Sequence, residues 1–303
     1  MKSRPGVDVA APPLSVGGRL PGRFADFVAL TKPRLNVLVV TTSAAGYYLA
    51  SPDGPAPLPM IAAVTGTALV AGGAAVLNQL YERDTDALME RTRSRPLPDR
   101  RLSSMDAWVF GLVLSGAGLL TLAVVSGAIA ALLALATIGI YLAVYTPMKR
   151  RSSLSTLVGA VPGALPPLIG WAASSGTLSV GGWTLFAIVF LWQIPHFMAI
   201  AWMYRDDYGR AGFPMLPVVE PDGRRTSRQA VMYAAALLPV SLAPTLVGVS
   251  GQVYFWLALV LGLGLVTLAM RFAAHRSDAS ARLLFYGSIT YLPLIWAVMV
   301  LDH

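Results

Sequence analysis

The 303-residue chain contains no cysteine and few charged residues. The lack of cysteine excludes disulfides, thiolate nucleophiles and cysteine-ligated metal sites. Only 13% of the residues are Asp, Glu, Lys or Arg, whereas 55% are apolar. A soluble domain carries about 25% charged residues. Together with a mean hydropathy of +0.63, this composition predicts an all-α polytopic membrane protein.

The N-terminus also lacks a long apolar run. Residues 1–24 are rich in Pro, Gly and Arg. This excludes a secretory signal peptide, because such a peptide needs a hydrophobic segment. We expect residues 1–24 to form a mobile cytoplasmic tail and residues 25–303 to form a single intramembrane domain.

Nine apolar stretches are each about long enough to cross a bilayer. They cover residues 27–48, 59–80, 105–125, 128–145, 154–173, 183–203, 230–249, 253–270 and 283–301. The sequence therefore predicts nine transmembrane helices.

Positive charge is missing from every second connection between these stretches. With Lys32 and Arg34 at the start of the first stretch assigned to the N-terminal side, all 23 Lys and Arg residues fall in the N-terminal segment and in the connections after stretches two, four, six and eight. This extreme positive-inside pattern predicts an N-in, C-out topology. Topogenic charge beside anionic lipid also explains the net charge of +8, so the expected partner is the lipid bilayer and not a nucleic acid.

The densest charge lies between Asn78 and Arg95, where four acids and four arginines fall within eighteen residues. Asn78, Glu82 and Asp86 are spaced by four, so on a helix they form one stripe of oxygen ligands. Such a stripe at the edge of a bilayer suits Mg²⁺, which in turn suits a diphosphate substrate. Solvated ion pairs are the structural alternative.

Basic residues near this stripe are candidates for diphosphate binding. Arg91 and Arg95 follow it, and Arg95 precedes Pro96, so this stretch is expected to have left the helix. A loop arginine there can clamp a diphosphate through two parallel hydrogen bonds. For Lys32, Arg34 and the Tyr145/Lys149 group, topogenic charge explains the residues equally well.

A second acidic cluster follows the sixth stretch, in the segment Tyr204-Arg-Asp206-Asp207-Tyr208. It lies on the same predicted face as the first cluster. We therefore expect the two clusters to converge on shared cations, with Asp206 and Asp207 as further metal ligands.

Two features inside the apolar stretches are unusual. His196 is the only histidine within a predicted span and stands in the string Gln-Ile-Pro-His-Phe. It is either a hydrogen-bonded structural residue or a cavity-facing ligand. The fifth stretch holds Pro162, Pro166 and Pro167. It is expected not to be a regular helix and to bend around a cavity, with close packing through small residues as the alternative.

These residues together resemble the UbiA superfamily of intramembrane prenyltransferases, and within it the heme-farnesylating branch. The resemblance covers nearly all of residues 27–301. It rests on six strings: Leu-Thr-Lys-Pro-Arg-Leu from position 30, residues 78–97, Tyr-Thr-Pro-Met-Lys-Arg from 145, residues 159–167, Trp-Gln-Ile-Pro-His-Phe from 192, and residues 204–217.

The resemblance implies nine helices around a central cavity open to lipid, and two acid-rich motifs that bind Mg²⁺ and diphosphate. The family's first motif falls on Asn78, Glu82 and Asp86, with Glu82 in place of the commoner Asp. The second motif, two Asp spaced by four, is not intact, because Arg210 and Ala211 stand where the second acid is expected. The resemblance leaves open whether Asp206 or Asp207 is the ligand.

For function, the resemblance implies transfer of a farnesyl group from farnesyl diphosphate to the vinyl group of heme B, which is then a substrate and not a cofactor. It places the enzyme in the bacterial inner membrane with its active site on the cytoplasmic side. A complex with a downstream heme-modifying enzyme is conceivable, but no residue argues for it.

Two alternatives remain at this point. A prenyltransferase acting on another aromatic acceptor, such as 4-hydroxybenzoate, a naphthoate or a chlorophyll-type ring, would keep the same diphosphate site. A transporter of lipids or ions is less consistent with the sequence, because a transport path needs polar groups near the midplane.

Overall fold

The computed structural model describes residues 22–303, which form only helices and connecting loops. The predicted tail, residues 1–24, therefore lies outside the described residues except for its last three. The helices are α1 (Arg23–Leu30), α2 (Pro33–Leu49), α3 (Pro57–Tyr81), α4 (Arg83–Asp86), α5 (Ser104–Thr121), η1 (Leu122–Ser126), α6 (Ala128–Gly139), η2 (Ile140–Tyr145), α7 (Thr146–Met148), α8 (Ser155–Ser175), α9 (Val180–Met203), α10 (Arg205–Arg210), α11 (Leu216–Val219), α12 (Arg224–Leu246), α13 (Gln252–His275) and α14 (Asp278–Leu301).

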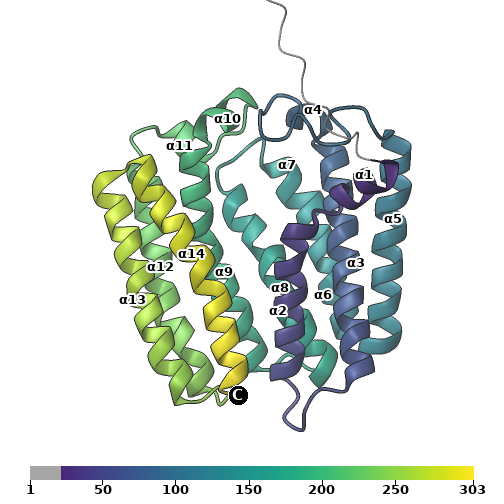
Figure 1. Cartoon of the computed structure of the whole chain (residues 1–303), viewed down its shortest axis with the longest axis vertical. Helices are drawn as coiled ribbons and strands as arrows, with labels where there is room; N and C mark the ends of the chain where they lie inside the picture. The colour runs from purple at the N-terminus through teal and green to yellow at the C-terminus, as the bar shows by residue number, and fades with distance from the viewer. Residues whose placement is uncertain (1–21) are drawn as a thin grey trace, which may run out of the picture.

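The long helices run side by side along the long axis of the molecule (Figure 1). On one side α9, α12, α13 and α14 pack together, and on the other α2, α3 and α6 pack around α8, with α5 packed against α3. The contact between α8 and α9 joins the two sides. Helices α8 and α9 are therefore the most deeply embedded elements, and much of the largest buried apolar cluster lies on α9.

Eight helical segments of the described chain are long and apolar enough to cross a membrane. This confirms the prediction of an all-α integral membrane protein. Helix α2 has only 17 residues and is not among the eight, so the count of nine spans stays a prediction, as does the topology.

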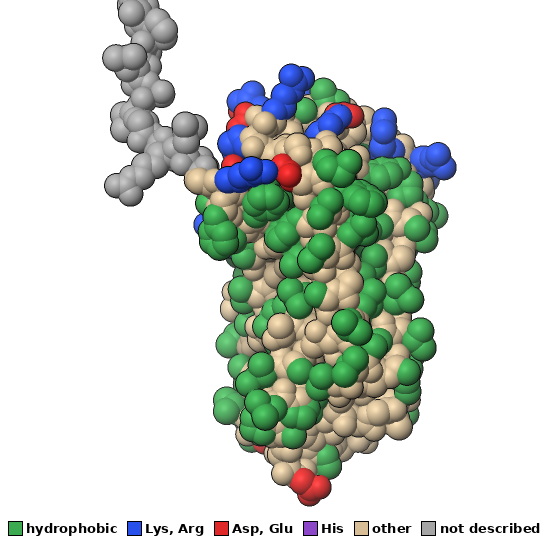
Figure 2. Space-filling model, turned by 90° about the vertical axis from the view of Figure 1, so that its right-hand side faces the viewer, with side chains coloured by type: hydrophobic (Ala, Val, Ile, Leu, Met, Phe, Trp, Pro, Cys, Tyr) green, Lys and Arg blue, Asp and Glu red, His purple; other side chains and the backbone are tan. Residues whose placement is uncertain are grey.

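Charge is confined largely to one end of the bundle, which we call the charged end (Figure 2). It carries α4, α7, α10 and α11 and the loops around them (Figure 1). On the face of the bundle shown in Figure 2, the side chains below this end are mainly apolar and almost free of charge. The connections that the sequence predicted on one side of the membrane thus lie at one end of the structure.

The first predicted span, residues 27–48, begins too early. Two helices meet there at Lys32, which adopts a left-handed conformation with φ 50°. Pro33 starts α2, and a residue before proline avoids the α-helical region, which breaks the helix at this point. The buried Gln79 side chain donates a hydrogen bond of 2.6 Å to the carbonyl oxygen of Leu30 and so satisfies the end of α1.

The prediction that the fifth stretch is not a regular helix is wrong. Helix α8 is continuous from Ser155 to Ser175, with three prolines inside it. Close packing explains how this segment is held. A Cβ at Gly46 would overlap with the carbonyl of Pro167, and one at Gly170 would overlap with that of Ser43. The backbones of α2 and α8 therefore touch, as small residues allow in membrane bundles.

Candidate active site at the charged end

The predicted stripe of Asn78, Glu82 and Asp86 is formed across the junction between α3 and α4. The backbone N–H of Glu82 donates to the carbonyl of Asn78 at 2.9 Å, and that of Asp86 donates to Glu82 at 2.7 Å. The four-residue spacing thus persists although α3 ends at Tyr81. All three side chains are buried, with exposed fractions of 1%, 6% and 1%.

Asn78 is held by residues from three other parts of the chain. Its side-chain oxygen accepts from Lys32 Nζ and from the Tyr141 hydroxyl, each at 3.3 Å. Its side-chain nitrogen donates to the Thr146 hydroxyl at 3.1 Å. The Thr146 hydroxyl in turn donates to the Tyr141 carbonyl at 2.7 Å, across the wide turn of η2. These bonds therefore fix the orientation of the Asn78 amide, with its oxygen toward the Lys32 ammonium group.

Glu82 pairs with Lys149, which follows α7. Lys149 Nζ lies 2.8 Å from Glu82 Oε1, and both side chains are largely buried. Burial alone would lower the pKa of Lys149, but Tyr145 and the Glu82 carboxylate outweigh it and raise the pKa above its ordinary value. Lys149 consequently stays charged at neutral pH.

Asp86 pairs with Arg95 on the loop that follows α4. Arg95 Nη1 lies 2.7 Å from Asp86 Oδ2, and the aspartate side chain is 1% exposed. The buried Thr92 hydroxyl donates to the Asp86 carbonyl at 2.7 Å and fastens the loop to α4. This arrangement matches the expectation that Arg95 leaves the helix and folds back.

Lys32 adds a third cation to Arg95 and Lys149. It lies between α1 and α2, and within residues 22–303 its ammonium group has only the neutral Asn78 side chain as a hydrogen-bond partner. Burial, reinforced by Arg95, lowers the pKa of Lys32 to about 8. Three cations therefore surround two carboxylates, which leaves an excess of positive charge for an incoming anion.

The loops from the two acidic clusters pack against each other. The Arg91 guanidinium lies over the ring of Tyr204 at 5.0 Å and over that of Tyr208 at 5.9 Å. Beneath it, Met89 joins Phe213 in a small apolar cluster. Lys149 Nζ lies 5.1 Å from the centre of the Phe213 ring. The two loops thus lie together at the charged end.

The two acidic clusters nevertheless differ in how they are presented. Asp206 is exposed, whereas the largely buried Asp207 pairs with Arg210 on its own short helix. No group of three acidic or histidine side chains close enough to share a metal occurs in the described part of the chain. Asp206 and Asp207 therefore remain proposed ligands.

Two other predicted residues lie away from the stripe. Arg34 is exposed in the first turn of α2. His196 lies within α9, where its Nδ1 is 2.8 Å from the Ser288 hydroxyl of α14. Tyr145 stacks on Tyr141 at 5.4 Å and so lines the site next to Lys149.

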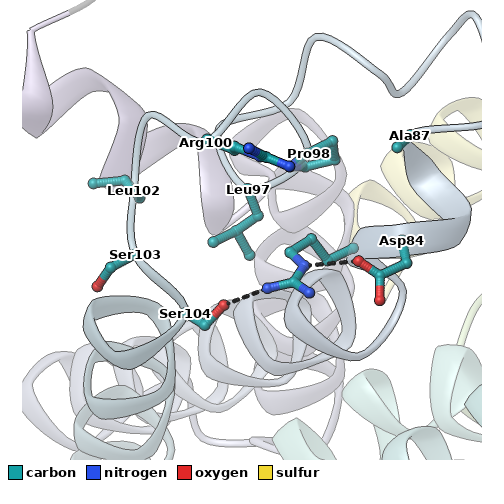
Figure 3. A pocket seen from close by; sticks show the side chains of 9 residues that line it. Asp84, Ala87, Leu97, Pro98, Arg100, Leu102, Ser103 and Ser104 are labelled. Atoms are coloured by element: carbon teal, nitrogen blue, oxygen red, sulfur yellow. Dashed lines mark hydrogen bonds and ion pairs between the residues drawn. The ribbon is translucent and has the colours of Figure 1, made fainter.

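A separate cavity of about 490 Å³ lies between α4, the loop of Leu97, Pro98 and Arg100, and the start of α5 (Figure 3). Arg83 points across it and bonds to Asp84 and Ser104, each at 2.9 Å. None of the stripe residues lines this cavity. Arg83 and Asp84, which lie off the stripe in sequence, thus tie α4 to the start of α5.

Sequence reasoning missed Tyr141, Thr146 and Phe213. The sequence does contain a pattern that points to Tyr141, because Tyr141 and Tyr145 repeat the four-residue spacing at the end of an apolar stretch. The π-helical geometry of η2, which brings Thr146 onto Tyr141, has no comparable signature. Phe213 becomes part of the site only through loop packing.

Comparisons with known proteins identify the family of this chain. The model of the UbiA prenyltransferase family matches residues 38–294. A protoheme IX farnesyltransferase from Solibacter usitatus is 47% identical over 287 residues, which cover 92% of this chain and 98% of that protein. One from Opitutus terrae is 45% identical, with 93% and 95% covered.

Among solved structures, a digeranylgeranylglyceryl phosphate synthase superposes with a TM-score of 0.79 at 14% identity, covering 92% of this chain and 98% of that one. A UbiA homologue from Archaeoglobus fulgidus bound to GPP and Mg²⁺ superposes with a TM-score of 0.67 at 16% identity, covering 90% and 99%. At these identities the likeness establishes the fold alone. From the extent of the family match and the near full-length relatives, the chain belongs to the UbiA prenyltransferase family.

Proposed function

We propose that this chain is a protoheme IX farnesyltransferase, which transfers the farnesyl group of farnesyl diphosphate to a vinyl group of heme B. The observation that carries the proposal is the buried oxygen stripe of Asn78, Glu82 and Asp86, surrounded by Lys32, Arg95 and Lys149. Relatives with this name, which match the chain over nearly its full length, support the choice of heme as acceptor.

The stripe has the chemistry of a Mg²⁺ site. Its donors are one amide oxygen and two carboxylates, and Mg²⁺ is often bound by one or two carboxylates together with substrate phosphates. Arg95 binds only Oδ2 of Asp86 and Lys149 only Oε1 of Glu82, so each carboxylate keeps a second oxygen. We propose Asn78, Glu82 and Asp86 as the primary ligands, with Asp206 and Asp207 as candidates from the second loop.

When bound, Mg²⁺ neutralises charge on the diphosphate and makes it a better leaving group. The cations of the chain act on the same charge. Lys32, Arg95 and Lys149 line the stripe, and Arg91 stands between the two loops, held by Tyr204 and Tyr208. Because their positions are fixed before substrate arrives, they stabilise the departing diphosphate without reorganisation.

The reaction then balances as follows. The bond between C1 of the farnesyl group and the diphosphate oxygen breaks, and its electron pair leaves with the diphosphate. A vinyl carbon of heme B forms a bond to C1, which leaves a cation on the carbon beside the porphyrin. Water adds to that carbon and loses a proton, which gives the hydroxyethylfarnesyl heme, heme O.

The aromatic rings beside the cations have a role in this scheme. Tyr141 and Tyr145 stack beside Lys149 and adjoin the stripe. Ring faces attract positive charge, so these two tyrosines are placed to favour the allylic cation once the diphosphate begins to leave.

We further propose that the protein lies in the bacterial inner membrane with nine spans and its charged end in the cytoplasm. The support is the distribution of all 23 Lys and Arg residues over alternate connections. Arg34, exposed at the start of α2, then lies near the membrane surface, where it can attract the diphosphate of a lipid-borne substrate.

The proposal is tested with membranes that contain or lack the protein, supplied with heme B, farnesyl diphosphate and Mg²⁺. We expect a heme that is heavier by one farnesyl group and one hydroxyl group, together with one equivalent of diphosphate. Removal of Mg²⁺ by a chelator should abolish both products, and its return should restore them. Unchanged heme, or farnesyl transfer to a different aromatic ring under the same conditions, would overturn the proposal.

A further inference from the structure

The His196 imidazole is held between two aromatic rings. Trp192 stacks on it with ring centroids 4.9 Å apart and planes at 19°, and Phe285 stacks on it at 5.1 Å and 22°. Trp192 lies one turn earlier on α9, whereas Phe285 lies on α14. With both faces covered, the imidazole can offer a ligand only its edges.

Hydrogen bonding determines what each edge offers. The Ser288 hydroxyl donates its single proton to the Phe285 carbonyl at 2.7 Å. Toward His196 Nδ1, 2.8 Å away, the hydroxyl oxygen can therefore only accept. Nδ1 must carry the proton, which leaves a lone pair on Nε2. Within residues 22–303, Nε2 makes no hydrogen bond of its own.

The same serine also fixes the stacking partner. The Trp192 indole donates from Nε1 to the carbonyl oxygen of Ser288 at 2.7 Å. One residue of α14 thus anchors both the imidazole and the ring stacked on it. A buried histidine needs only its own hydrogen-bond partners, whereas here the stacked ring is held in place as well. This arrangement is typical of a metal-binding imidazole, whose second nitrogen donates to a fixed acceptor.

The position of His196 relative to the charged end suits a large substrate. His196, Ile200 and Tyr204 follow one another at a spacing of four along α9 and its C-cap, so they belong to one broad face of the helix. Tyr204 contacts Arg91. At 1.5 Å per residue, His196 lies about 12 Å from Tyr204 along the helix axis. A planar acceptor bound at His196 can therefore reach toward the diphosphate site with its rim.

We propose that His196 binds the iron of the heme substrate through Nε2, and that Ser288 is the residue that positions it by holding the proton on Nδ1. The inference rests on the proposed function, since it takes heme B as the acceptor. Iron coordination would fix the porphyrin plane and leave its vinyl groups free to be turned toward the farnesyl cation.

The test uses the purified full chain in detergent, titrated with heme B in the absence of farnesyl diphosphate. We expect the absorbance and resonance Raman spectra of the reduced protein to show an iron–histidine bond. His196→Gly should lose this bond, and added imidazole should restore it. That rescue separates a lost ligand from a misfolded variant.

Ser288→Ala should weaken heme binding about 10-fold, in line with the loss of a residue that supports a metal ligand, and lower the iron–histidine stretching frequency. Ser288→Thr, which keeps the hydroxyl, should restore both. Two matched controls should change neither. Thr290→Val removes a hydroxyl that bonds to a backbone carbonyl on the exposed side of α14, and His275→Ala removes an exposed histidine.

An unchanged iron–histidine signal in His196→Gly without imidazole would overturn the inference. If that variant also still converts heme B to heme O, the proposed function stands and only the role of His196 fails. If the wild-type protein neither binds nor farnesylates heme B, the proposed function fails as well.

Discussion

The two acidic clusters at the charged end have similar compositions but are built differently. Glu82 and Asp86 are buried and pair with Lys149 and Arg95, residues that come from a different helix and from a loop. In the second cluster, Asp206 is exposed and Asp207 pairs with a neighbour three residues away. The first cluster is tied into the tertiary structure, whereas the second depends mainly on local contacts.

The burial of the first cluster indicates that it is organised before substrate binds. A buried carboxylate is stable only when its partner and its remaining hydrogen bonds are in place. The stripe must therefore be complete before substrate arrives, so its geometry is part of the fold. The exposed Asp206 is under no such constraint, and the loop that carries it can adjust when substrate binds.

The largest loss of activity is expected from a substitution of Asp86 in the first cluster. We expect Asp86→Asn to lower the initial rate of heme farnesylation about 10³-fold, since it removes charge from a preorganised electrostatic site. Asp84→Asn is the matched control, because Asp84 is exposed and lies off the stripe. Near-normal activity in Asp86→Asn would remove this residue from the metal site.

The next largest effect is expected on stability at Lys149. Lys149→Met leaves Glu82 buried without its partner, which should cost about 3 kcal/mol and lower the unfolding temperature in detergent. The double variant Glu82→Gln/Lys149→Met should recover most of that stability but not the activity. A single variant as stable as the wild type would show that the pair is not coupled to the fold.

Substitutions in the second cluster are expected to lower activity less than substitutions in the first. We expect Asp207→Asn to lower activity about 10-fold, the scale seen when support of a metal site is lost, whereas Asp206→Asn should stay within about 2-fold because that side chain faces solvent. Titration of activity against Mg²⁺ concentration measures both variants. The reverse order would identify Asp206 as the ligand.

A small effect, on substrate binding alone, is expected where the two loops meet. Tyr204→Leu removes the ring nearest to Arg91, and an exposed cation–π contact is worth about 0.5–1 kcal/mol. We expect the KM for farnesyl diphosphate to rise about 3-fold with kcat unchanged. Tyr286→Leu, at an exposed ring of α14, is the control. A large loss of kcat would instead place Tyr204 at the reacting carbon.

Much of this architecture could be predicted from the sequence, because the membrane imposes strong regularities. The lengths of the apolar stretches predicted eight of the helices, although three of these helices extend about five residues further at their charged ends. The spacing of Asn78, Glu82 and Asp86 predicted their common face, which holds even though α3 ends between them. Arg95 was also expected to leave the helix, because the residue before a proline avoids the α region.

The failures have equally physical causes. Three prolines in α8 suggested an irregular segment, but packing through Gly46 and Gly170 holds the helix together. Lys32 adopts a left-handed conformation for which lysine has no intrinsic preference, so the apolar pattern predicted one continuous span and missed the break between α1 and α2. The partners of Asn78 depend on a π-helical turn, for which no residue pattern is diagnostic.

The close approach of α2 and α8 limits which positions can be substituted when the enzyme is engineered for other acceptors. Since any side chain at position 46 or 170 would strike backbone of the opposite helix, the seam between them tolerates glycine alone. In a saturation library selected for bulkier acceptors, these two positions should be the first depleted of variants. Diversity is better directed at Phe285 of α14, whose ring covers one face of His196.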